Sequence, residues 1–449
     1  MLLLPLMAAG GNFVPPFDPY FSSTTLLLKA TGANGAQNNT FLDSSSNAFT
    51  ITRNGGAPGM SQGAFSPFSP AFPYSPTTHG GSGYFDGVGD FLTTGTGAGL
   101  NLNGVDWTLS GWFYPTASSA GIHAIVQSTT GTNNWEPYLS FTLAADNSVR
   151  TTINAVGYAT TSAVATLNAW NYFEMARSGS TVTTYLNGAS VHSVTSDLPS
   201  SNLAFEIGKT DNYQGYLYYF PGYISGIRVL NGTAGSGAIP TTPPTAITNT
   251  QLLLNFTNAG IIDAHASNVV DAVGNAQCST GTKKWLESVS FDGTGDQLLL
   301  NSAIPAEFGT GDFTIECYLH LNSVTGVRAL FDSRGAGNPA TWNIVLYMNG
   351  AVISFYSNQA DRIAGSTLST GVWYHIALCR SGSSTKLFVA GVQVGSTYTD
   401  TNTYVAVAPL RIAADDTNQA NCYIEDFRIT KGVARYTTTF TPPEQLVAQ

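Results

Sequence analysis

The chain has 449 residues, of which only 10% are charged, and its 27 acidic and 17 basic residues give a net charge of -10. A nucleic-acid-binding surface requires a basic patch. No cluster of Lys and Arg occurs along the sequence, so we expect no nucleic-acid partner. With 43% hydrophobic residues the chain is not typical of a disordered protein, and its 47 glycines favour short strands joined by tight turns.

The N-terminal region, residues 1–23, begins with an apolar run that is far too short to span a bilayer, and we expect no membrane insertion. Pro15, Pro16 and Pro19 favour extended coil. We therefore expect an extended arm that packs on the protein or on a neighbour. A secretory signal is the alternative, although the basic residues that begin such a signal are missing.

The chain then repeats itself. Residues 85–90 read FDGVGD and residues 291–296 read FDGTGD, and the landmarks downstream stay about 200 residues apart. This period is the size of a whole domain, well above the unit of a solenoid. We expect a first domain over residues 24–233, a Gly/Pro/Thr-rich linker over 234–249 and a second domain over 250–443.

Both copies show the alternation of half-buried strands. In residues 313–321 the odd positions are apolar and the even positions mostly polar, which puts one face in a core and one outward. No segment carries a sustained helical stripe. Regular strands without crossover helices predict antiparallel sheets packed as a sandwich or jelly roll.

The first copy carries extra residues at 57–76, where aromatic side chains alternate with prolines. These rings are Phe65, Phe68, Phe72 and Tyr74. One interpretation is a loop folded back over the sheet. The other is a contact strip for a partner, because rings held on a stiff backbone bind at low entropic cost.

Five ordered motifs of the second copy, at residues 291–296, 311–316, 373–377, 387–391 and 424–429, resemble the laminin-G-like, concanavalin A-like jelly roll family. The first copy matches more loosely at 85–90, 106–111, 170–176 and 185–188. The resemblance implies an all-β protein of two tandem antiparallel β-sandwich jelly rolls.

A narrower resemblance concerns residues 428–436 and 440–443, which look like the ending of such domains in virion proteins of tailed phages, including phages of marine cyanobacteria. Residues 252–260 and 41–47 are similar to the same group. This resemblance implies a structural or tail-fibre protein on the virion surface, extracellular once released. Its partners would be other virion proteins, further copies of itself and a host-surface glycan.

Catalysis on a glycan requires two carboxylates about 5–10 Å apart, and on one strand Glu-x-Asp would supply them. No such string occurs, and the adjacent pairs Asp415-Asp416 and Glu425-Asp426 point to opposite faces of an extended strand. We therefore expect no enzyme.

Calcium is a possible cofactor of the second domain. Asp292 and Asp296 flank a Gly-rich turn whose carbonyls suit a hard cation, and the resemblance implies such a site, to which Asp426 or Glu425 would add a ligand. The alternative is that Asp292 and Asp296 only cap the turn.

A glycan site needs rings that stack on sugars and polar groups that bind hydroxyls. The candidates are Trp135, Tyr213, Tyr216, Tyr218 and Tyr219 in the first copy, and Trp342 and Asn418 in the second. The tyrosines are equally typical of an interface between domains. Three functions remain: a glycan-binding attachment protein, a purely structural capsid-decoration or tail-joining protein, and the disfavoured glycan-degrading enzyme.

Overall fold

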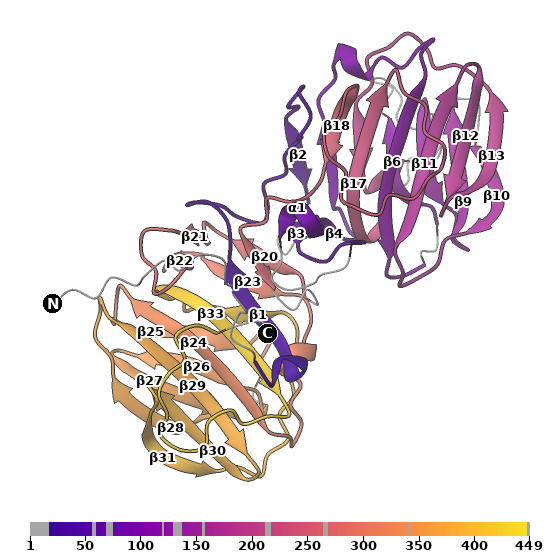
Figure 1. Ribbon diagram of the computed structural model, residues 1–449. Helices are drawn as coiled ribbons and strands as arrows, with labels where there is room; N and C mark the ends of the chain where they lie inside the picture. The colour runs from indigo at the N-terminus through magenta and orange to yellow at the C-terminus, as the bar shows by residue number, and fades with distance from the viewer. Residues whose placement is uncertain are drawn as a thin grey trace.

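The computed structural model describes residues 18–55, 60–68, 75–118, 121–128, 137–154, 158–211, 217–263, 268–339 and 341–446. Its strands form antiparallel sheets that pack in pairs as two β-sandwiches (Figure 1). The described helical segments are short: η1 (Phe21–Ser23), α1 (Pro76–His79), η2 (Ala98–Leu100) and η3 (Ile304–Ala306). The all-β jelly-roll prediction is confirmed.

The first sandwich pairs two sheets, which we call the β6 sheet and the β7 sheet. The β6 sheet has the order β13 (Ala189–Thr195), β12 (Thr181–Leu186), β11 (Asn171–Ser178), β6 (Trp107–Pro115), β17 (Pro221–Asn231), β4 (Ser82–Asp86) and β3 (Ser61–Gly63), with β18 (Thr250–Leu254) paired to β17. The β7 sheet has the order β10 (Tyr158–Val164), β9 (Ser148–Ile153), β8 (Leu139–Leu143), β7 (His123–Ser128), β14 (Phe205–Ile207), β5 (Phe91–Thr94) and β2 (Ile51–Asn54). A small hairpin joins β15 (Lys209–Asp211) to β16 (Leu217–Tyr219).

The second sandwich repeats this plan with a β24 sheet and a β25 sheet. The β24 sheet has the order β19 (Ile261–Asp263), β1 (Thr24–Ala30), β33 (Asn421–Lys431), β24 (Phe313–Leu321), β29 (Trp373–Ser381), β30 (Ser384–Val389) and β31 (Val392–Thr399), with β22 (Ser288–Asp292) on β33 and β21 (Gln277–Ser279) on β22. The β25 sheet has the order β20 (Val270–Val273), β23 (Gln297–Leu300), β32 (Leu410–Ile412), β25 (Val327–Asp332), β26 (Val345–Asn349), β27 (Val352–Ser357) and β28 (Ala360–Thr367).

Each sandwich has its own apolar core between its two sheets. Phe113 on β6, Phe141 on β8 and Phe173 on β11 meet in the first core, and Phe313 and Phe331 lie in the second. These are the inward positions of the period-2 alternation. The four cysteines are buried with free thiols, and all lie in the second half of the chain.

The two sandwiches exchange their first strands. Strand β1, from the first repeat, pairs with β33 of the second sandwich, with Leu28 opposite Phe427. Strand β18, from the second repeat, pairs with β17 of the first sandwich, with Leu254 opposite Ile227. The predicted boundaries at residues 24 and 250 therefore need correction. The first sandwich runs from β2 to β18, and the second consists of β1 together with β19 to β33 (Figure 1).

The segment expected to link the domains, residues 234–249, instead connects two neighbouring strands of one sheet, β17 and β18. It lies on the first sandwich, where Gly237 donates its N–H to Glu174 Oε1 at 2.7 Å and Pro244 packs beside Gly226. The segment after β33 runs over the second sandwich in the same way, with Phe440 packed on Phe388 and His375. Both segments therefore belong to the sandwich that precedes them in the chain.

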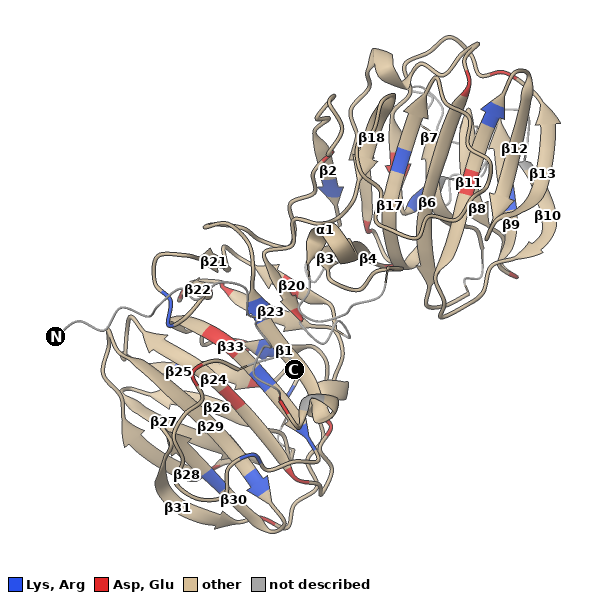
Figure 2. Ribbon diagram, viewed as in Figure 1, with Lys and Arg blue, Asp and Glu red and all other residues tan. Residues whose placement is uncertain are grey.

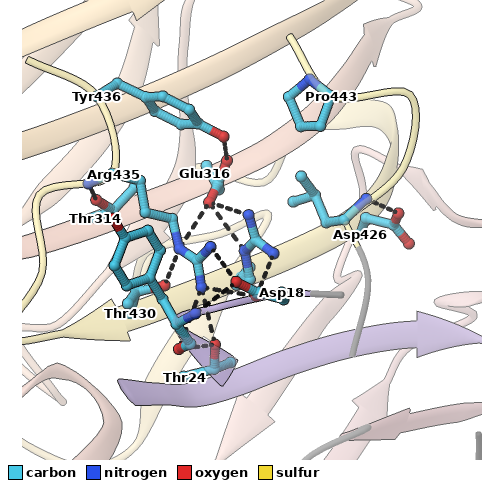
Figure 3. Close-up of polar contacts among 12 residues, drawn as sticks. Asp18, Thr24, Thr314, Glu316, Asp426, Thr430, Arg435, Tyr436 and Pro443 are labelled. Carbon is cyan, nitrogen blue, oxygen red and sulfur yellow. Dashed lines mark hydrogen bonds and ion pairs between the residues drawn. The ribbon is translucent and has the colours of Figure 1, made fainter. Parts of the chain in front are cut away.

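A buried polar cluster holds the start of the described chain against the β24 sheet (Figure 3). Glu316 on β24 accepts hydrogen bonds from Nε and Nη2 of Arg428 at 2.9 and 2.8 Å. The Asp18 carboxylate is 3.1 Å from Arg428 Nη1 and 2.9 Å from Arg435 Nη1. Further along, Lys29 Nζ on β1 is 2.6 Å from Asp426 on β33. These ion pairs tie residues 18–30 to the second sandwich.

The described part of the aromatic insert folds back over the outer face of the β6 sheet. The Phe65 ring lies 5.1 Å from Tyr114, 5.2 Å from Trp170 and 4.7 Å from Tyr223, and Phe68 lies 5.7 Å from Trp112. This packing follows the first of the two interpretations. Phe72 and Tyr74 lie outside the described residues. No helix among the described residues is both long and apolar enough to cross a membrane.

Candidate functional site

The tyrosine-rich candidates of the first sandwich are described only in part. Trp135, Tyr213 and Tyr216 lie outside the described residues. Tyr218 and Tyr219 lie half-buried on β16, where Tyr218 rests against Gly121 and Tyr219 lies 6.1 Å from Phe91. These two rings thus pack within their own sandwich.

The calcium candidates Asp292 and Asp296 cap the turn that they flank. Asp292 accepts the N–H of Thr294 at 2.7 Å, while Asp296 accepts the N–H groups of Asp292 and Asn275, both at 2.8 Å. These are the side-chain to backbone bonds of the alternative interpretation.

Asp426 takes a different role, because it binds Lys29 Nζ and the N–H of Leu446. Glu425 accepts the N–H groups of Lys284, Trp285 and Leu286. Within the ranges that the structure describes, no group of three or more acidic, His or Cys side chains is placed to hold a metal ion. The predicted calcium ligands therefore do not form a cluster there.

The second sandwich carries a polar network on the outer face of the β25 sheet, centred on Arg334. Its guanidinium binds Asp332 at the end of β25 through Nε–Oδ1 and Nη2–Oδ2, both at 2.9 Å. The same Nη2 lies 3.2 Å from Asp415 Oδ2. Alternation on β25 puts Asp332 outward, because Phe331, its neighbour in the chain, faces the core. We call Asp332, Arg334, Asp415 and Asn418 the Arg334 network.

Asn418, one of the predicted residues, belongs to this network. Its side-chain amide donates to Asp415 Oδ1 and Oδ2 at 3.1 and 3.0 Å, and its backbone N–H donates to Oδ1 at 2.7 Å. The loop after β32 is thereby folded around one carboxylate. Next to it, Asp416 lies 2.6 Å from Arg411 Nη2 and keeps 25% of its side chain exposed.

Two half-buried tyrosines on neighbouring strands extend the network. Tyr347 on β26 and Tyr356 on β27 lie edge to face, with their ring centres 6.2 Å apart. The Arg334 guanidinium lies 5.9 Å above the Tyr356 ring, and the Tyr347 hydroxyl donates to the exposed Asp361 at 2.7 Å. Rings, a guanidinium and carboxylates therefore share one outer face.

Trp342, the other predicted residue of this copy, lies in the loop before β26. It is half-buried against the core, and the Arg362 guanidinium lies 4.8 Å from its ring centre. A cavity of about 20 Å³ between Arg334, Tyr356 and Asn358 has room for one water molecule. This cavity is too small to hold a sugar.

The carboxylates of the Arg334 network are bound by groups of the protein itself. Burial raises the pKa of Asp332, and the Arg334 guanidinium offsets only part of this shift. For Asp415, burial alone would raise the pKa, but hydrogen bonds from Thr417 and Asn418 outweigh it and lower the value. The Asp332 side chain is fully buried, with both oxygens bound by Arg334. It is therefore not placed to protonate a glycosidic oxygen.

The first sandwich has a different network at the corresponding place. Gln127 on β7 donates to Glu206 at 2.7 Å, Lys209 lies 3.2 Å from the same carboxylate, and Thr210 donates to Gln127 at 2.6 Å. The strand pairings put Thr142 and Thr152 where the second sandwich has Tyr347 and Tyr356. The two outward-facing tyrosines are thus particular to the second copy.

Sequence reasoning found the neighbourhood of this site through Trp342 and Asn418 but missed Asp332, Arg334, Tyr347 and Tyr356. A signal was available for the tyrosines, because the period-2 alternation of residues 345–349 and 352–357 points both of them outward. No local signal links Arg334 to Asp415, which is 81 residues away.

A family model described as the concanavalin A-like lectin/glucanases superfamily matches residues 86–239 and 292–435, which is more than half of the chain. A search of curated proteins found no match. Among solved structures, domains LG4-5 of the mouse laminin α1 chain are similar at 15% identity and a TM-score of 0.27, over 78% of this chain and 96% of that chain.

The LG1-3 region of the laminin α2 chain is similar at 11% identity and a TM-score of 0.36, over 79% of this chain and 66% of that chain. The binding domain of botulinum neurotoxin serotype C1 is similar at 12% identity and a TM-score of 0.31, over 92% and 95%. Likenesses at this level add nothing about the ligand.

Proposed function

Because the chain belongs to the concanavalin A-like lectin/glucanases superfamily, we propose that it is a non-enzymatic protein that binds glycans through the Arg334 network and the neighbouring tyrosines. The proposal has a second part: the chain stands on the surface of a tailed-phage virion, where it acts as a host-attachment protein. The resemblance of residues 428–443 to the endings of phage virion proteins supports the second part.

The observation that carries the glycan proposal is the pairing of Tyr347 and Tyr356 with fixed polar groups on one outward face. A flat ring offers an apolar platform to the C–H face of a sugar. Asp416, Asn418 and Asp361 offer acceptors and donors to its hydroxyls at the edges of that platform. Since Arg334 is held by two carboxylates, these groups are positioned before a ligand arrives, which lowers the entropic cost of binding.

A shallow surface of this kind binds weakly. Many copies on one particle would turn millimolar contacts into useful avidity, because each additional contact becomes intramolecular once the first is made. The partners in this proposal are further copies of the chain and other virion proteins on one side and a surface glycan of the host on the other.

The test is a glycan array probed with the full chain, followed by calorimetric titration of the best ligand. We expect millimolar affinity and about a tenfold loss in Tyr356→Ala, equivalent to about 1.4 kcal/mol. The matched control is Thr152→Ala, at the corresponding position of the first sandwich, which we expect to leave affinity unchanged. Absence of binding on the array at millimolar glycan, or an equal loss in both variants, would refute the site. Release of shorter oligosaccharides would refute the non-enzymatic function.

A further inference from the structure

An amine and a carboxylate meet inside the protein where the exchanged strand β1 lies along β33. Lys29 Nζ on β1 is 2.6 Å from Asp426 Oδ1 on β33, although the two residues are 397 positions apart in the chain. Only 16% of the Lys29 side chain and 4% of the Asp426 side chain are exposed. Leu446, whose backbone contacts both residues, is buried in a cluster with Leu27 and Tyr318. The pair is therefore largely shielded from water.

The backbone of Leu446 orients the two groups. Its carbonyl oxygen accepts a hydrogen bond from Lys29 Nζ at 2.5 Å, and its N–H donates to Asp426 Oδ2 at 3.0 Å. Because Oδ1 is bonded to the carboxyl carbon Cγ, Nζ lies about 3 to 3.5 Å from Cγ, which is the separation of a near-attack arrangement. A donor fixed at Oδ2 stabilises the negative charge that develops on this oxygen when an amine attacks Cγ.

A second carboxylate lies on the same face of β33. Ile424 and Phe427 both point into the core, because the register with β24 shifts between Glu425 and Arg428 and Asp426 has a positive φ of 57°. Glu425 and Asp426 therefore both point outward, which corrects the expectation that they point to opposite faces. Burial raises the pKa of Glu425, and the charge of Asp426 adds to this shift. Two buried carboxylates on one face repel each other, so converting one of them into an amide removes this repulsion.

We propose that Lys29 and Asp426 condense into an amide that joins β1 covalently to β33. The ion pair of the freshly folded chain is the reactant. Lys29 passes one proton to the carboxylate, the neutral amine attacks Cγ, and a C–O bond of the carboxyl group breaks. The water that leaves carries one carboxylate oxygen and two of the three ammonium protons, and the new bond joins Nζ to Cγ. No net proton is exchanged and no co-reactant is needed.

The first sandwich provides an internal comparison. Asn255 and Gly226 occupy the positions that correspond to Lys29 and Asp426, so this place in the first sandwich has neither an amine nor a carboxylate. The amide would thus form only on β1, the strand that completes the sandwich of the other repeat. Because unfolding does not break an amide, the bond would make this half of the strand exchange permanent.

The test is the mass of the intact full chain after purification and storage at neutral pH. We expect a mass lower than that of the sequence by one water, and proteolysis should release a branched peptide that joins Lys29 to Asp426. Lys29→Arg keeps the positive charge but has no amine to acylate, so it should keep the full mass. The matched control is Lys284→Arg, at an exposed lysine, which should lose one water as the unmodified chain does.

Three results would overturn the proposal: the full mass in the unmodified chain, a loss of water that persists in Lys29→Arg, or a dehydrated peptide that maps elsewhere, such as a succinimide at Asp292-Gly293. The peptide map of the unmodified chain does not depend on whether the variants fold. The amide would lie on the β24 sheet, whereas the proposed glycan surface lies on the β25 sheet. Failure of one proposal therefore leaves the other intact.

Discussion

At the scale of single residues, the buried charges of the β24 sheet decide how the N-terminal segment is held. In Figure 2, acidic and basic residues lie close together on strands β24 and β33. Glu316 is completely buried, with Arg428, His375 and Tyr436 within hydrogen-bonding distance. A buried carboxylate that loses its charge leaves its cationic partners unpaired, which is costly in a medium of low dielectric constant.

We therefore expect Glu316→Gln to lower the free energy of unfolding at pH 7 by about 3 kcal/mol, measured by urea titration. Burial alone would raise the pKa of Glu316, but Arg428 and His375 outweigh it and lower the value to about 2. A carboxylate with a depressed pKa stabilises the fold above its unfolded pKa near 4.3. This contribution is lost as the pH falls from about 4.5 to about 2.

In that acid range the stability of the unmodified chain should fall steeply, and that of Glu316→Gln should fall less steeply. The exposed Glu307 provides the control, because Glu307→Gln should stay within about 0.5 kcal/mol of the unmodified chain. Parallel pH curves for the unmodified chain and Glu316→Gln would show that this carboxylate is not the group responsible.

At the scale of strands, the exchange of β1 and β18 raises the question of how each finds its place. Their sequences are similar: β1 reads TTLLLKA, and residues 250–256, which begin with β18, read TQLLLNF. Each lies along the corresponding strand, β1 on β33 and β18 on β17. One difference is the pair Lys29 and Asp426, which corresponds to Asn255 and Gly226 in the first sandwich. Asp426 and Gly226 both sit at a bulge with positive φ, of 57° and 60°.

We expect Lys29→Ala to cost about 2 kcal/mol in unfolding free energy, because the buried Asp426 would lose its cationic partner and keep, among the described residues, the N–H of Leu446. The control is Asn255→Ala at the corresponding position directly after β18, where the uncharged side chain accepts hydrogen bonds from the hydroxyls of Ser44 and Thr257. Its cost should stay below about 0.5 kcal/mol, measured by the same urea titration. Equal effects would show that the ion pair does not select the place of β1.

The sequence predicts the strands and the repeat well, because inward positions such as Phe113 and Phe313 alternate with polar neighbours over short range. It does not predict the exchange, since the two leucine triplets carry the same local signal for either place. The Asp18–Arg428 contact joins residues 410 apart, and the aromatic insert offered two interpretations until Phe65 was seen on its three rings. The sequence thus leaves open which of two similar segments, distant in the chain, pairs with a given strand.

At the scale of the whole molecule, each sandwich is completed by a strand that the chain order assigns to the other repeat. Unfolding one sandwich therefore loosens a strand of its neighbour. We expect a single cooperative transition in calorimetry, with Phe113→Ala in the first core lowering the stability of the whole chain by about 4 kcal/mol. Two separate transitions, of which only one moves in the variant, would contradict this coupling.

The exchange also places both described ends of the chain, Asp18 and Leu446, on the second sandwich (Figure 1). Strands β1 and β33 are adjacent and antiparallel there. A pulling force applied between the two ends would be carried by that single ladder, and the first sandwich would bear no load. If the protein is tethered by both ends, the attachment is made through the second sandwich, and the first sandwich projects from it as a side domain outside the path of the force.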